Sequence, residues 1–395
     1  MLNKKIPIMI PWMGEEEAAA ARRPILSGWT TQGPEVAAFE KEFAEIVGAK
    51  YACAVSNCTT ALHLALKAVG VKAGDEVITV SHSFIATANA IRYCNATPVF
   101  VDIEPHTFNM DATLIERAIT GRTKAILCVH QMGMPCDLKT ISEIAKRNSL
   151  FVIEDAACAI GSEILWDGIR EKIGKPRGDI ACFSFHPRKL ISIGDGGMIT
   201  TLNAEWDKQF RLWRQHSMGV PDTVRHKANE VIFESYTDLG YNYRLTDIQA
   251  AVGREQLKRL KAIIERRRMM AERYHQLLNS VNGLVLPEEP SWARSNWQSY
   301  CVRLPDRCDQ RTVMQKMLGA GISTRRGIMC AHREPAYTKD VWSCGGEPCD
   351  CDTATCKRLV QSELAQDRSI LLPLFHQMTE ADQDFVVGKL CEACA

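Results

Sequence analysis

Short apolar runs alternate with amphipathic stretches along the first 200 residues of the chain. Most of the runs are apolar at consecutive positions, which is typical of strands buried on both faces of a mainly parallel sheet. Strands are predicted at residues 51–55, 76–80, 98–103, 124–130, 150–154, 179–185 and 197–201. A helix is predicted before the first strand at 35–47, and further helices are predicted between the strands at 60–68, 85–93, 111–119 and 138–146. This rhythm predicts an α/β fold, with a seven-stranded sheet flanked by helices.

The regular alternation of predicted strands and helices ends after residue 201. A helix is predicted at 204–215 and a polar loop at 221–234. Thr246-x-x-Gln249 then forms a capping box, which opens a long helix to about Leu278. Mixed signals follow Pro287 and Pro290. We therefore predict a large α/β domain over residues 1–255 and a smaller α+β domain over residues 256–395.

Composition narrows the function classes. The net charge of +1 argues against a dedicated nucleic-acid binder, which would carry a basic surplus. No run of 18 apolar residues exists, so no membrane span is expected. The N-terminal apolar stretch is short, holds two prolines and runs into acidic residues, unlike a signal peptide. A cytoplasmic protein is expected.

Cysteine is abundant, with 16 residues. Most lie in apolar runs and are interpreted as small core residues, as at Cys53, Cys94, Cys128 and Cys182. A separate group lies in a Gly/Asp-rich stretch at Cys344, Cys349, Cys351 and Cys356. A zinc site is conceivable there, but the spacing lacks paired Cys-x2-Cys knuckles. A loop with free thiols is therefore favoured, and no metal site is predicted.

Ligands of open α/β sheets bind beyond the carboxyl ends of the strands, so the residues after each predicted strand are the candidates for chemistry. Cys58 and Thr59 open a helix, where free backbone N–H groups can bind an anion. The alternative is an ordinary helix cap. Phe84 follows the second strand and could stack on a planar ligand, or belong to the core.

An acid and a lysine follow two further strands. Asp155 ends an apolar strand, where a carboxylate is unfavourable without a cationic partner such as a protonated pyridine. Ser184 could bind phosphate, and Lys189, five residues later, could reach the same cavity. Nearby positive charge would make the Lys189 amine easier to deprotonate and hence nucleophilic. The alternatives are a helix cap and a solvated lysine.

Together these groups match the requirements of pyridoxal 5′-phosphate (PLP): a phosphate cradle, a stacking ring, a carboxylate for the ring nitrogen and a lysine nucleophile.

At these residues the chain resembles the DegT/DnrJ/EryC1/StrS family of sugar aminotransferases. The similar segments are Gly33-Pro34-Glu35, SNCTTALHLAL at 56–66, FIATANA at 84–90, PVFVD at 98–102, EDAA at 154–157, SFHPRK at 184–189, GYNYRLTDIQAA at 240–251, HREPAY at 332–337 and LPL at 372–374. Several specific motifs in one order, over nearly the whole chain, make coincidence an inadequate explanation.

The resemblance implies a fold-type-I PLP-dependent transferase that acts as a homodimer with shared active sites. Lys189 would carry PLP as a Schiff base, and Asp155 would pair with the pyridine nitrogen. Phe84 would stack on the ring. Phosphate contacts would come from Cys58, Thr59, Ser184 and, from the partner subunit, Asn242. Substrate contacts are assigned to Thr31, His186, Arg244, His332 and Arg333.

The expected reaction moves an amino group from glutamate or glutamine to a keto sugar, with a nucleotide-linked sugar favoured. A keto-cyclitol or a non-nucleotide keto sugar is the alternative acceptor. A sugar dehydratase would carry histidine at position 189, so Lys189 weighs against it. A non-catalytic PLP or sugar sensor is the alternative from another class. One departure from the family lies at Cys158, where many relatives have Gln or His near the cofactor.

Overall fold

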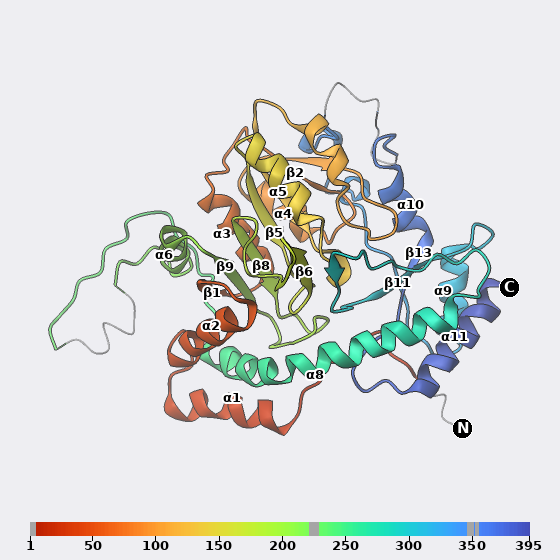
Figure 1. The fold of residues 1–395 in the computed structure, drawn as a ribbon. Coiled ribbons are helices and arrows are strands. Elements are labelled where there is room, and N and C mark those ends of the chain that lie inside the picture. The colour runs from red at the N-terminus through yellow and green to blue at the C-terminus, as the bar shows by residue number, and fades with distance from the viewer. Residues whose placement is uncertain (1–4, 221–228, 346–350, 352–354) are drawn as a thin grey trace.

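The computed structural model describes residues 5–220, 229–345, 351 and 355–395. A seven-stranded sheet lies at its centre (Figure 1), in the order β1-β9-β8-β5-β4-β2-β3. Its strands are β1 Tyr51–Val55, β2 Glu76–Val80, β3 Thr97–Val101, β4 Thr123–Val129, β5 Phe151–Asp155, β8 Ile180–Ser184 and β9 Gly197–Thr201. Only β9 pairs antiparallel to its neighbours. The seven predicted strands and the mainly parallel sheet are confirmed.

Alternation along each strand divides the apolar side chains between two faces of the sheet. In β1, Ala52 and Ala54 enter one core, while Cys53 and Val55 enter the other. The first core is covered by α2 Pro34–Val47, α5 Leu138–Arg147 and α8 Asp247–Leu278. The second is covered by α3 Cys58–Ala68, α4 Ala86–Tyr93 and α6 Ala204–Trp213. The result is a three-layer α/β/α arrangement, in which the carboxyl ends of the parallel strands share one edge.

One predicted helix is wrong. Residues 111–119 form two 3₁₀ turns, η1 Ala112–Leu114 and η2 Glu116–Ala118. The Asp111 side chain accepts a hydrogen bond from the Thr113 backbone at 3.0 Å, which favours a tight turn. The buried residues Ala112, Ile115 and Ala118 recur every third position, the period of a 3₁₀ helix rather than an α-helix.

The long helix α8 begins as predicted, with Thr246 and Gln249 forming the capping box. It runs along the base of the molecule (Figure 1) and packs against α1 Glu15–Ser27, a helix that was not predicted. Glu17 of α1 is buried and accepts hydrogen bonds from the Gly14 backbone and the Gln256 side chain.

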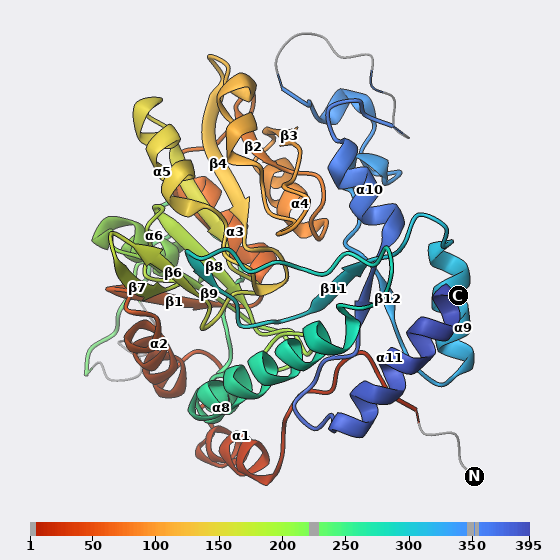
Figure 2. The ribbon, with the colours of Figure 1, turned by 45° about the vertical axis from the view of Figure 1, so that its right-hand side comes forward.

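A third core lies against the C-terminal half of α8 (Figure 2) and includes Tyr274, Tyr300 and Ile322 together with Ile6. Its small sheet has the order β11-β13-β12. The remaining elements are β6 Glu163–Trp166, β7 Ile169–Lys172, β10 Ala293–Arg294, β11 Tyr300–Arg303, β12 Arg325–Arg326, β13 Ser369–Leu372, α9 Gln310–Gly319, α10 Val360–Arg368 and α11 Glu380–Cys394. Short 3₁₀ turns lie at η3 Gln131–Gly133, η4 Ala331–Arg333 and η5 Lys339–Val341.

The division of the chain at residue 255 stays a prediction, and that position lies inside α8. Of the predicted loop at 221–234, residues 221–228 lie outside the described residues, and 229–234 form no helix or strand. Among the described residues, no helix has the length and apolar character that crossing a membrane requires.

Candidate active site

Lys189 lies in a fixed loop just after β8. Phe185 anchors this loop, because its ring is fully buried and packs on Phe39 and Phe43, with centroids 5.3 and 5.7 Å away. Its backbone N–H donates to the Gly196 carbonyl at 2.9 Å, and the Lys189 N–H donates to the His186 carbonyl at 2.8 Å. The backbone that carries the lysine is therefore held at the carboxyl end of the sheet.

The Lys189 side chain is surrounded by acidic groups. Its Nζ donates a hydrogen bond to the Cys158 sulfur at 3.0 Å. Burial lowers the pKa of the Lys189 ammonium, but Cys158, Asp155 and Cys58 raise it by more, so the net pKa is above its usual value. The expectation that neighbouring positive charge makes Lys189 easier to deprotonate is therefore wrong, because its nearest ionisable neighbours are acids.

Asp155, the last residue of β5, is buried and oriented by two hydrogen bonds. The Thr87 hydroxyl donates to Oδ2 at 2.8 Å, and the Ala157 backbone N–H donates to Oδ1 at 3.2 Å. The Ser83 hydroxyl lies within hydrogen-bond distance of the Thr87 hydroxyl, 2.8 Å away. Burial raises the pKa of the Asp155 carboxyl more than these bonds and Lys189 lower it. Such a carboxyl gains most from a cationic partner.

The first turn of α3 offers two backbone donors beside this pair. Asn57 caps the helix by accepting from the Thr60 N–H at 2.9 Å. The N–H groups of Cys58 and Thr59 have no acceptor among the described residues. The Ser184 hydroxyl lies at the end of the neighbouring β8. These groups are of the kind that bind a phosphate at a helix N-terminus.

Gly197 keeps this turn close to the sheet. A Cβ at this position would lie 2.5 Å from the Asn57 carbonyl carbon and 2.9 Å from the Cys58 nitrogen. Only glycine lets β9 pack so closely on the first turn of α3. Together with Asp155 and Lys189, the residues present fit PLP: two free N–H donors and a hydroxyl for its phosphate, a buried carboxylate for its ring nitrogen, and an amine for its aldehyde.

Two predicted cofactor contacts lie on the surface. The Phe84 side chain, which follows β2, is 63% exposed and contacts no other ring among the described residues. Asn242 is exposed as well. Its neighbour Tyr243 accepts a hydrogen bond from the Ser56 N–H at 2.9 Å, so this segment borders the α3 turn.

The residues predicted to bind substrate are not gathered at one point. Thr31 and His186 are exposed and Arg244 is half-buried. His332 is completely buried: its Nδ1 lies 2.6 Å from the Ser81 hydroxyl and its Nε2 lies 3.1 Å from Glu363. Arg333 forms ion pairs with Glu363 and Asp367. In the structure, these interactions of His332 and Arg333 stabilise the loop that contains them. A role of the two residues in substrate binding stays a prediction.

The sequence argument missed two polar groups around Asp155. Thr87 lies in the FIATANA segment, and its place on an apolar helix face was the available signal. His130 lies beyond β4, next to a strand end, and its Nε2 lies 3.0 Å from Glu154. The Cys136 N–H donates to its Nδ1 at 3.0 Å, so Nε2 carries the proton and donates to the glutamate.

The side chain of His82, two residues before Phe84, is fully buried, and neither ring nitrogen has a hydrogen-bond partner among the described residues. Its ring stacks on Phe108 at 5.9 Å. Burial lowers the pKa of His82 from 6.5 to about 3.

Replacing this histidine is expected to flatten the acid side of the stability profile. Between pH 6.5 and about 3 the unfolded chain binds a proton at His82 and the folded chain does not, so stability falls as pH falls. The full effect is roughly 5 kcal/mol. His82→Phe should lose this slope in urea unfolding measured across that range. The surface variant His106→Phe is the control, and an equal slope in wild type and His82→Phe would contradict the prediction.

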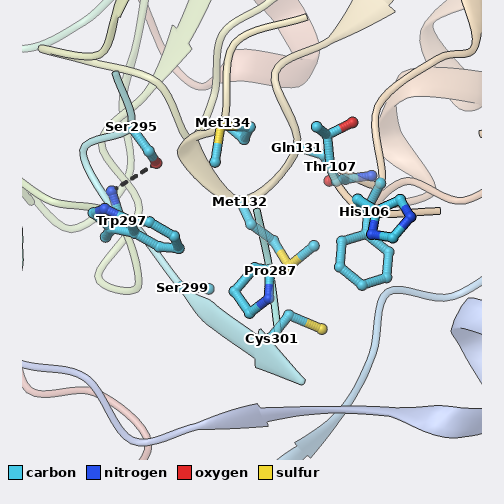
Figure 3. Close-up of a pocket in the computed structure, with 11 residues that line it drawn as sticks. His106, Thr107, Gln131, Met132, Met134, Pro287, Ser295, Trp297, Ser299 and Cys301 are labelled. Carbon is cyan, nitrogen blue, oxygen red and sulfur yellow. Dashed lines mark hydrogen bonds between the residues drawn. The ribbon is translucent and has the colours of Figure 1, made fainter. Parts of the chain in front are cut away.

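Lys189 is not among the residues that line the small cavity drawn in Figure 3. Its lining includes His106, Met132, Met134, Trp297 and Cys301. None of its lining residues is a predicted site residue. The candidate cofactor site is therefore defined by the converging polar groups and not by this cavity.

The three-layer fold, with a buried carboxylate and a lysine at the carboxyl edge of its sheet, defines a fold-type-I PLP-dependent aminotransferase. Residues 11–391 match the model of the DegT/DnrJ/EryC1/StrS aminotransferase family, and the chain belongs to this family.

Similar proteins support the same assignment. The chain is 35% identical to the spore coat polysaccharide biosynthesis protein SpsC of Bacillus subtilis, over 98% of this chain and 96% of that protein. The crystal structure of the aminotransferase TlmJ from Streptoalloteichus hindustanus is 31% identical with a TM-score of 0.86, covering 98% of both chains. The structure of S. venezuelae DesV, in complex with a ketimine intermediate, is 30% identical with a TM-score of 0.85, also covering 98% of both.

Proposed function

We propose that Lys189 Nζ holds PLP covalently and that the enzyme moves an amino group from glutamate or glutamine to a keto sugar, in particular a nucleotide-linked one. The observation that carries the proposal is the convergence of Lys189 and Asp155 at the carboxyl edge of the sheet, where each shifts the pKa of the other. The membership of a sugar aminotransferase family supports a sugar acceptor. The polysaccharide role in the name of SpsC points the same way.

Each residue has a distinct task in this proposal. When bound, PLP would accept into its ring the electron pair of the broken substrate C–H bond. The Cys58 and Thr59 N–H groups and the Ser184 hydroxyl would bind the phosphate. Asp155, oriented by Thr87, would keep the ring nitrogen protonated. Lys189 Nζ, once released, would take the proton from the substrate Cα and deliver it to the neighbouring cofactor carbon.

Cys158 is positioned to act on the same amine. Its sulfur lies 3.0 Å from Lys189 Nζ. A thiol at this distance accepts a weaker hydrogen bond than an amide or imidazole would. We infer that the thiol holds Lys189 less firmly than a Gln or His at position 158 would.

A cytoplasmic homodimer is part of the proposal. Phe84 and Asn242 are exposed, and so are Val231 and Phe233, which are 84% and 91% accessible. Large exposed apolar side chains of this kind indicate a surface that a second protein covers. A second copy of the chain would cover them and complete the site, with Asn242 reaching the phosphate from the partner subunit.

The decisive experiment separates the two half-reactions. Purified holoenzyme treated with glutamate or glutamine should lose the visible absorbance of lysine-bound PLP. After the donor is removed, a panel of nucleotide-linked keto sugars, free keto sugars and keto-cyclitols is tested for return of that absorbance. Return with a nucleotide-linked sugar supports the proposal, and return with a cyclitol alone assigns the alternative acceptor. A protein that binds PLP but responds to no donor would be a sensor.

A further inference from the structure

Three cysteines outside the active site converge at one point beside β3. The sulfurs of Cys344, Cys351 and Cys356 all lie within 4.8 Å of one another. The Cys344 and Cys351 sulfurs are 3.9 Å apart, and those of Cys351 and Cys356 are 2.7 Å apart. Cys351 and Cys356 are buried, and Cys344 is partly buried. This thiol cluster takes no part in the chemistry at Lys189.

Two described parts of the backbone beside the thiol cluster are hydrogen-bonded to regular elements. The Ser343 N–H donates to the Pro98 carbonyl at 3.0 Å, and its carbonyl accepts from the Phe100 N–H at 2.6 Å. The Cys356 N–H donates to Glu363 of α10 at 2.5 Å. Apolar packing against Phe100, Trp342 and Leu359 surrounds two of the sulfurs. Cys344 is therefore placed beside β3 by the bonds of its neighbour Ser343, and Cys356 is placed by its bond to α10.

We propose that the thiol cluster is a structural zinc site, with Cys344, Cys351 and Cys356 as three of its ligands. Zinc binds thiolate sulfur at about 2.3 Å in tetrahedral geometry, which places ligand sulfurs about 3.8 Å apart. The Cys344–Cys351 separation already matches, and the Cys351–Cys356 separation needs to open by about 1 Å. We leave the fourth ligand unassigned.

Oxidation is the competing state of these sulfurs. Cys351 is disulfide-bonded in the structure, whereas Cys344 and Cys356 are free. A disulfide uses two sulfurs, and further thiols this close to it can attack it and exchange pairings. A zinc ion instead uses all three at once. Zinc binding therefore requires that the Cys351 disulfide is first opened. A cellular dithiol reductant would reduce it to two thiols and would itself be oxidised to a disulfide. Each ligand thiol then releases its proton to solvent when zinc binds.

The position of the thiol cluster gives the metal a structural purpose. Glu363, which accepts from the Cys356 N–H, also bonds His332 and Arg333. His332 in turn bonds Ser81, three residues before the predicted ring-stacking Phe84. Zinc would therefore stabilise Cys356 beside Glu363 of α10. Through Glu363 and His332 it would also stabilise Ser81, which follows the end of β2 on the cofactor side of the sheet.

Metal content tests the proposal directly. The protein is expressed with added zinc and purified under a non-chelating reductant, and bound metals are measured by mass spectrometry. We expect about one zinc per chain in wild type. Cys344→Ser and Cys356→Ser should each lose most of it, while Cys391→Ser, a matched change in α11, should retain it.

A second measurement avoids variants that fail to fold. Wild-type protein stripped of metal under reducing conditions is titrated with Co²⁺, and thiolate coordination should produce a sulfur-to-cobalt charge-transfer absorbance. Hydrogen exchange at Ser343 and Phe100 should rise on stripping and fall when zinc is restored. Metal-free protein with no Co²⁺ absorbance, or iron in place of zinc, would overturn the proposal, and so would a disulfide that persists under reductant. These readouts do not depend on transamination, so their failure leaves the proposed function intact.

Discussion

Lys189→Ala is expected to abolish transamination, with a fall in turnover of about 10⁴-fold or more. The variant loses both the amine that would hold the cofactor and the group that would move the proton. Its PLP should be released by gel filtration and should lack the visible absorbance of the lysine-bound form. Turnover is measured as glutamate-dependent amination of the acceptor found in the half-reaction panel.

Two controls separate chemistry from charge. Lys189→Arg keeps the positive charge near Cys158 and Asp155, but a guanidinium is a poor nucleophile, so this variant should be equally inactive. Lys41→Ala removes an exposed lysine from α2 and should keep full activity. Many turnovers by Lys189→Ala, together with lysine-bound absorbance, would rule out the assignment of Lys189.

Asp155→Asn should give the second-largest loss, about 10²- to 10³-fold in kcat, because it removes a preorganised charge from the reacting system. The buried amide keeps the shape of the carboxylate but cannot hold a proton on the ring nitrogen. PLP should remain bound to Lys189, so its absorbance persists while the half-reaction with glutamate slows. Stopped-flow spectroscopy of that half-reaction measures the effect.

Stability distinguishes a catalytic role of Asp155 from a packing role. Burial raises the pKa of this carboxyl, so the charged form is unfavourable in the folded protein without a cationic partner. The Asn variant stripped of PLP should therefore unfold at the same temperature as stripped wild type, or higher. Thr87→Val, which removes only the 2.8 Å hydrogen bond to Asp155, should lower the rate by about tenfold. A large loss of thermal stability in Asp155→Asn would instead indicate a packing role.

The central sheet could be predicted because each of its strands carries its own signal. Buried strands are apolar at nearly every position, so the run from Ile180 to Phe183 indicates a strand without any tertiary information. The helix α1 was missed because its alanines give a weak apolar stripe and Pro24 lies inside it. Residues 111–119 were misjudged because apolar residues three apart fit a 3₁₀ turn as well as an α-helix.

The site was only partly predictable, because its energetics depend on contacts between distant residues. Lys189 and Asp155 could be placed at strand ends, but the bond from Thr87 to Asp155 spans 68 positions. The pKa of Lys189 depends on Cys158, 31 positions away. The spacing of the cysteines also could not show that the sulfurs of Cys344, Cys351 and Cys356 lie within 4.8 Å of one another.

The contact between Ser343 and β3 has a consequence for solubility. Strand β3 lies at one end of the seven-stranded order, where unpaired backbone groups can recruit a strand from another molecule. Ser343 bonds the backbone of Pro98 and Phe100, and so occupies part of that exposed edge. Release of this segment would uncover a flat, apolar template for aggregation. Ser343, next to the first cysteine of the thiol cluster, thus covers part of the sheet edge farthest from β1 and would oppose self-association there.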